Sequence, residues 1–134
     1  MMKVEVKGLA ELGRKLNELD AELQTKILRS AGKAAMEVVK EDMQRHAGYD
    51  KNSPGPHMRD DIKIRSSRAK KYRDGVMITV APTKKHRMKA IAQEFGTVKQ
   101  IAAPFIRPAL DYNRSAVLKT LTAEIRDALS SYSK

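Results

Sequence analysis

Residues 9–38, LAELGRKLNELDAELQTKILRSAGKAAMEV, carry the periodicity that decides the fold. Leucines recur here at spacings of three and four residues, which is typical of an amphipathic helix. The stripe consists of Leu9, Leu12, Leu16, Leu19 and Leu23 and continues through Ile27, Ala31 and Val38. Gly13 and Gly32 interrupt it, and each costs about 1 kcal/mol relative to alanine in a helix interior. The pattern predicts one long helix, or two helices end to end, over about residues 9–46 with a bend near Gly32.

Strand patterns flank this helix. KVEVK at residues 3–7 alternates polar and apolar side chains and predicts a short strand. Ile62 and Ile64 alternate with charged residues, and VMITV at 76–80 is rich in β-branched side chains. We therefore expect an antiparallel pair of strands near 61–67 and 75–81, joined by an exposed basic loop near 65–75. The leucine register is too short for a coiled coil, so the helix is expected to pack on this sheet.

Breaks and helix signals organise the rest of the chain. AGYDKNSPGPH at 47–57 has the composition of a turn and predicts a mobile loop within one domain. RMKAIAQEF at 87–95 predicts a short helix with its apolar residues on one side, followed by Gly96. Pro108 stands where a C-terminal helix can begin, and apolar spacing carries that helix to about residue 131. The predicted fold class is α+β: a single domain over 1–134, in which a long N-terminal helix and a C-terminal helix pack on a small antiparallel sheet.

Composition narrows the class of protein. The 134 residues suit one domain with its own core. The chain has no cysteine, which excludes disulfides and thiolate metal sites. No apolar run reaches the roughly 20 residues of a membrane span, and the first residues lack the apolar region of a signal peptide. We expect a cytoplasmic protein with no membrane partner.

Positive charge is concentrated in the middle of the chain. Residues 48–100 carry 13 basic and 5 acidic side chains, whereas residues 1–47 carry 9 and 8. The densest group surrounds Tyr72 and consists of Arg65, Arg68, Lys70, Lys71 and Arg73. These side chains are candidates for contact with a polyanion such as DNA, or with a partner protein. With few aromatic residues to stack on bases, we favour a protein that covers the loop over direct nucleic-acid recognition.

The residues give no sign of catalysis. His46, His57 and His86 are far apart and match no metal-ligand spacing. Phosphate-binding glycine loops and nucleophile motifs are absent from the sequence. Met36, Met43, Met77 and Met88 fall at apolar positions, and their expected role is to fill the core. We therefore predict neither an enzyme, nor a cofactor, nor a metal site.

Two short motifs flank one loop. Glu94-Phe95-Gly96-Thr97 precedes it, and Pro104-Phe105-Ile106-Arg107-Pro108-Ala109-Leu110 ends it. Phe95 and Phe105 are the only phenylalanines, so we expect both to be buried and to anchor the loop. Gly96 is expected to adopt a positive φ, and the two prolines stiffen the return. Arg107 stands at a helix start, where a cation is unfavourable, and Glu94 is its expected partner. Two alternatives are that Arg107 is solvated, or that it pairs with a carboxylate of a neighbouring subunit.

These motifs carry a resemblance to a family. VKGLAELGRKLNEL, GPHMRDDIKI, EFGT and PFIRPAL together resemble the head–tail joining, or tail-completion, proteins of long-tailed bacteriophages. The resemblance implies a non-enzymatic neck protein of the virion, made in the host cytoplasm. It implies a homo-oligomeric ring, commonly of six subunits, in contact with other phage neck and tail proteins. The family motif residues are Glu94, Phe95, Gly96, Thr97, Pro104, Phe105, Arg107 and Pro108.

Two other functions remain open. A small basic module that binds nucleic acid without sequence specificity would also explain the charged middle of the chain. A small nuclease or toxin is the third hypothesis, and the lack of a paired acid–base constellation counts against it. The EFGT and PFIRPAL pair favours the virion protein.

Overall fold

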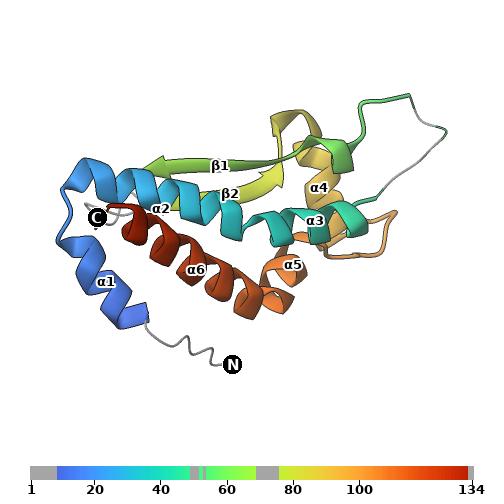
Figure 1. Cartoon of the computed structure of the whole chain (residues 1–134). Coiled ribbons are helices and arrows are strands. Elements are labelled where there is room, and N and C mark those ends of the chain that lie inside the picture. The colour runs from blue at the N-terminus through green and yellow to red at the C-terminus, as the bar shows by residue number, and fades with distance from the viewer. Residues whose placement is uncertain (1–8, 49–51, 53, 69–75, 133–134) are drawn as a thin grey trace.

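The computed structural model describes residues 9–48, 52, 54–68 and 76–132. A β-hairpin lies on one side, helices α2 and α3 run through the middle, and α6 lies on the other side (Figure 1). The predicted α+β class is confirmed. Helix α6 packs on α2, and α2 in turn packs on the sheet. No helix of the described residues has the length and apolar character needed to cross a membrane.

The N-terminal helical region is three helices, α1 (Leu9–Asn17), α2 (Ala21–Ala35) and α3 (Glu37–His46), so the prediction of one or two is wrong. The first break follows from capping: the carboxylate of Asp20 accepts the N–H of Leu23 at 2.9 Å and starts α2. Helix α1 turns away and packs on α6. Leu12 and Leu16 of α1 therefore cluster with Ile125 and Leu129 of α6 instead of packing on a sheet.

The bend expected near Gly32 falls four residues later, at Met36, where α2 ends and α3 begins, and α2 continues through Gly32 itself. Gly32 serves a close approach between α2 and the sheet. A Cβ at this position would lie 2.7 Å from Cγ1 of Ile78, well inside van der Waals contact. The missing side chain lets the helix pack tightly on the neighbouring strand.

The hairpin consists of β1 (Ile62–Arg68) and β2 (Val76–Pro82), within one residue of the prediction. The strands are antiparallel, with Ile62 opposite Pro82 and Arg68 opposite Val76. Side chains alternate between faces: Ile62 and Val80 are buried, whereas Lys63, Arg65 and Met77 are exposed. The strand predicted at 3–7 and positions 69–75 of the basic loop lie outside the described residues.

Two 3₁₀ turns flank the hairpin, η1 before β1 and η2 after β2, and α4 follows η2. These are η1 (Met58–Asp61), η2 (Lys84–His86) and α4 (Arg87–Phe95), and α4 matches its predicted range. The single C-terminal helix predicted from Pro108 is instead α5 (Ile106–Tyr112) and α6 (Arg114–Tyr132). Asn113 explains the break, since its side-chain amide donates to the Ala109 carbonyl at 2.7 Å and to Asp42 on α3 at 2.6 Å.

Two apolar clusters form the core. One joins the hairpin to α3, α4 and α5 around Val39, Met43, Ile62 and Phe105. The other joins α1, α2 and α6 around Leu12, Leu16, Ile27 and Ile125. The methionine prediction holds for Met43, but Met77 and Met88 are 52% and 76% exposed.

Candidate assembly surface

Gln93 ties the end of α4 to two distant segments. This side chain is buried, and its amide nitrogen donates to the carbonyls of His46 at 2.8 Å and Ala103 at 3.1 Å. Its amide oxygen accepts the N–H of Gly48 at 2.7 Å. The backbone adds a bond from Ala103 N–H to the Gln93 carbonyl at 2.8 Å. Sequence reasoning missed this residue, because a glutamine between Ala92 and Glu94 on a short helix carries no local signal of burial.

Glu94 holds the start of α5. One carboxylate oxygen accepts the N–H groups of Phe105 and Ile106, each at 2.9 Å, and the other accepts that of Arg107 at 3.3 Å. Burial disfavours the charged form, but these hydrogen bonds outweigh it, and the Arg107 charge adds to them. They hold the pKa of the Glu94 carboxyl below its ordinary value. A carboxylate at a helix N-terminus also interacts favourably with the helix dipole.

The predicted salt bridge between the side chains of Glu94 and Arg107 is wrong, because each side chain has a different partner. Glu94 does join the two ends of the loop, but it binds backbone N–H groups of 105–107. The Arg107 guanidinium lies 3.7 Å from the Asp111 carboxylate, with its side chain 86% exposed. The unfavourable cation at the helix start is thus offset by the Glu94 carboxylate and by a residue one turn later on α5.

The loop between these anchors is ordered by its own backbone. Gly96 ends α4 with φ of 80°, as predicted, and a Cβ there would lie 3.0 Å from the Ala102 nitrogen. Thr97 and Gln100 exchange backbone hydrogen bonds of 2.9 and 3.2 Å. The Thr97 hydroxyl accepts the N–H of Lys99 at 3.2 Å. The loop therefore presents its tip in a defined conformation.

Apolar side chains on this ordered segment face solvent. Val98 and Ile101 at the tip are fully or almost fully exposed. Phe105 is buried as predicted, but Phe95 is 77% exposed, which contradicts the expectation that both phenylalanines anchor the loop. Phe95, Pro104, Pro108 and Tyr112 line a shallow cleft of about 460 Å³ beside Glu94 and Arg107. Exposed apolar side chains gathered beside a cleft make this segment a candidate site of contact with another molecule.

The basic residues predicted to contact a polyanion are separate from this surface. Arg65 is exposed on the outer face of β1, and Arg68 is the last residue of that strand. Lys70, Lys71 and Arg73 lie outside the described residues. The strand ends next to this loop lie at the opposite end of the molecule from α5 (Figure 1). The structure does not bring the two candidate sets together.

A buried polar network lies at the base of the hairpin. His86 is 4% exposed, with Nδ1 2.8 Å from an Asp61 carboxylate oxygen and Nε2 3.3 Å from the Pro56 carbonyl. The Thr83 hydroxyl donates to the same Asp61 oxygen. Its hydrogen bond, with that of His86, holds the Asp61 pKa below its ordinary value. The hairpin register could have predicted this contact, because pairing Ile62 with Pro82 places Asp61 near Thr83.

This network is structural in its geometry. It fixes the segment before β1 to the segment after β2. A separate pair lies on α3, where Nδ1 of His46 is 2.8 Å from the Asp42 carboxylate. Across the part of the chain that the structure describes, no group of three or more His, Cys, Asp or Glu side chains is placed to hold a metal ion.

Comparison with known proteins gives one match. A family model described as "Bacteriophage HK97-gp10, putative tail-component" matches residues 10–96. The matched range runs from α1 to Gly96, so the PFIRPAL motif lies beyond it. None of the curated proteins and none of the solved structures matched the chain.

Proposed function

Since the chain belongs to the HK97-gp10-like family of phage tail components, we propose that it is a structural protein that joins or completes the tail at the head–tail interface. It acts by contact and catalyses no reaction. Its partners are other phage neck and tail proteins, and it resides in the virion after assembly in the host cytoplasm. The family match over residues 10–96 is the observation that carries this proposal.

The geometry of residues 94–107 supports a role in assembly. Three hydrogen bonds to Glu94 and the bonds of Gln93 hold this segment rigid. Contacts made by a pre-ordered loop lose less conformational entropy than contacts made by a flexible one. The exposed apolar residues at 95, 98 and 101 are the side chains that such a contact would cover. In the assembled virion we propose a homo-oligomeric ring, with six subunits as the size that the family resemblance implies.

Deletion of the gene from the phage or prophage that encodes it tests the role. We expect DNA-filled heads and full-length tails to accumulate separately, as seen by electron microscopy. Purified protein added to such a lysate should restore joined, infectious particles. Normal virions from the deletion strain, or virions that lack the protein by mass spectrometry, would refute the proposal. Tails of abnormal length would instead place the protein at tail termination.

Non-specific contact with DNA is the second candidate function. Lys63 and Arg65 are exposed on the outer face of β1, next to the basic loop. Binding through such residues should be weak, indifferent to sequence, and lost steeply as salt rises. Neutralising the five cations of the predicted group, Arg65, Arg68, Lys70, Lys71 and Arg73, should remove most of it. Tight binding to one sequence at physiological salt would favour the nucleic-acid module over the virion protein.

A further inference from the structure

One side of α4 exposes a row of apolar side chains. Met88, Ile91 and Phe95 follow one another at spacings of three and four residues, and they are 45–77% exposed. Helices pair along such spacings, because residues three and four positions apart share one face. The opposite side of α4 carries the buried Ala90 and Gln93, so the fold holds the helix with this row outward. We call the three exposed side chains the α4 ridge.

A recess adjoins the end of the α4 ridge. Phe95, the last residue of the ridge, also lines the cleft beside α5. The cleft has a volume of about 460 Å³, and its other apolar walls are Pro104, Pro108 and Tyr112. Glu94 fixes these walls by capping α5 through backbone hydrogen bonds. A projection beside a rigid recess suits a partner that has side chains of its own, such as a helix of another protein, better than it suits the fluid surface of a bilayer.

Positive charge flanks the α4 ridge. Arg87 and Lys89 precede and follow Met88 in the sequence, and successive residues on a helix are about 100° apart. The two cations therefore stand on the two sides of the ridge. Both side chains are exposed, and neither forms an ion pair with a carboxylate among the described residues.

The wider surface is also positive. Residues 84–112 contain six Lys or Arg and two Asp or Glu side chains. Both carboxylates already have partners, since Glu94 accepts backbone N–H groups of α5 and Asp111 lies 3.4 Å from Arg114. A partner of this surface therefore gains from acidic side chains, and a basic partner is repelled.

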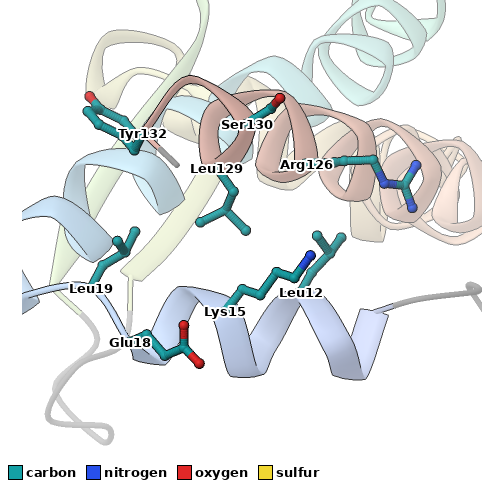
Figure 2. A pocket seen from close by; sticks show the side chains of 8 residues that line it. All are labelled: Leu12, Lys15, Glu18, Leu19, Arg126, Leu129, Ser130 and Tyr132. Atoms are coloured by element: carbon teal, nitrogen blue, oxygen red, sulfur yellow. The ribbon is translucent and has the colours of Figure 1, made fainter. Parts of the chain in front are cut away.

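The groove between α1 and α6 lacks this selectivity. Leu12 and Leu129 face each other across it from the two helices, and charges of both signs, on Lys15, Glu18 and Arg126, stand around them (Figure 2). Mixed charges favour neither an acidic nor a basic partner. Of these two surfaces, only the α4 ridge has surroundings that specify the chemistry of what covers it.

We propose that the α4 ridge binds an amphipathic helix of another protein, in which aspartate and glutamate side chains border an apolar stripe. The stripe covers the ridge, one of its larger side chains enters the cleft, and the acidic borders pair with Arg87 and Lys89. This inference deepens the proposed function, on which it rests only for the expectation that the partner is a neck or tail protein.

Synthetic helical peptides test the chemistry of the partner, in titrations with the purified full chain followed by fluorescence anisotropy. The probe has about 20 residues, enough to form a helix, with leucines at spacings of three and four and glutamates on both sides of them. One control peptide has lysines in place of the glutamates, and the other has glutamines in place of the leucines. We expect the probe to bind about tenfold more tightly than either control peptide, which corresponds to about 1.4 kcal/mol.

Apolar variants locate the contact on the chain. Met88→Gln combined with Phe95→Gln removes apolar surface without changing charge, at the two most exposed positions of the ridge. This double variant should weaken binding of the probe about tenfold. Met77→Gln, at an exposed apolar position on β2, is the matched control and should change the affinity less than about twofold.

Charge-reversal variants test the flanking cations. Arg87→Glu combined with Lys89→Glu should weaken binding of the probe about tenfold and strengthen binding of the lysine peptide. Acidic residues are favourable in the first turn of a helix, so folding is expected to be retained. Lys26→Glu combined with Arg29→Glu, at exposed positions on α2, is the matched control with the same change of net charge and should leave the order of the three peptides unchanged.

Several results would overturn the proposal. These are equal affinity for the three peptides, or equal losses from the reversals on α4 and α2. Self-association of the free chain that Met88→Gln with Phe95→Gln abolishes would assign the ridge to a second copy instead. Binding to phosphatidylglycerol vesicles that the same variant abolishes would assign it to a membrane.

The outcome is separable from that of the proposed function, because every titration uses the isolated chain. Loss of the peptide contact would leave the virion role intact. Normal virions from the deletion strain would refute the virion role and leave the peptide result in place.

Discussion

Replacing Glu94 tests whether its carboxylate holds the loop of residues 97–104 in place. Its two oxygens accept the backbone N–H groups of Phe105, Ile106 and Arg107. Removing a side-chain cap costs about 0.5–2 kcal/mol, and a hydrogen bond to a charged group contributes about 1.5–3 kcal/mol. Because the N–H of buried Phe105 loses its acceptor in Glu94→Ala, we expect this variant to lose about 2–3 kcal/mol of unfolding free energy.

Glu94→Gln separates charge from hydrogen bonding. The amide oxygen can still accept the two 2.9 Å bonds, while the charge and the longer bond to Arg107 are lost. We expect a loss of about 1 kcal/mol, the size of a charge–helix-dipole interaction together with one weak hydrogen bond. Glu124→Gln, at an exposed position on α6, is the matched control and should change stability by less than about 0.5 kcal/mol.

The pH dependence provides a second measurement of the same carboxylate. The folded-state pKa of Glu94 is lowered from 4.5, so its stabilisation is present above that value and is lost as pH falls through the folded pKa. Wild type and Glu94→Gln should therefore converge in stability as pH falls through the lowered folded pKa of Glu94. Denaturant unfolding followed by circular dichroism measures both quantities.

Limited trypsin digestion reports the loop itself. Lys99 is the only cleavage site between residues 90 and 106. Trypsin should cleave after Lys99 faster in Glu94→Ala than in wild type or Glu124→Gln. Equal stability of Glu94→Gln and Glu124→Gln at neutral pH, together with unchanged cleavage at Lys99, would refute the assigned role of Glu94.

Further results are expected from five single substitutions. Phe105→Ala should cost about 3–5 kcal/mol because its ring is buried, whereas Phe95→Ala should cost less than about 0.5 kcal/mol, both by denaturant unfolding. Arg107→Ala should leave stability within about 0.5 kcal/mol, since its guanidinium is exposed and its ion pair with Asp111 lies at the surface. Any loss of particle assembly would then assign Arg107 to an interface. Gln93→Leu should destabilise by about 1–3 kcal/mol, because it leaves the Gly48 N–H without its acceptor. Asp61→Asn should be less stable than wild type at neutral pH and approach it as pH falls through the lowered folded pKa of that carboxyl, in unfolding measured across pH.

Local signals predicted the parts of the fold that local chemistry determines. The hairpin strands, the range of α4 and the positive φ of Gly96 each follow from neighbouring residues. The breaks at Asp20 and Asn113 did not follow from periodicity. Each is made by a side chain that caps or crosses between helices, and an apolar stripe continues unchanged through such a residue.

The sequence predicted the location of the candidate site, but the contacts predicted for its side chains were wrong. A clamp between the two loop ends, involving Glu94, was expected from the charge at Arg107. Opposite charges suggested a side-chain pair, but the backbone N–H groups at the start of α5 compete for the same carboxylate and lie in better geometry. Gln93 was missed because its three partners come from segments distant in the sequence or brought back by the loop.

The orientation of α4 connects the wrong prediction to function. Met88, Ile91 and Phe95 share one side of the helix, and periodicity alone would place that side in the core. The structure instead buries Ala90 and Gln93 and leaves the larger apolar side chains exposed. In a chain whose local choices agree with its final packing, such a stripe is covered by something. The stripe leads from α4 directly into the loop with Val98 and Ile101, so the side of α4 that sequence reasoning places in the core is the side that we expect a partner protein to cover.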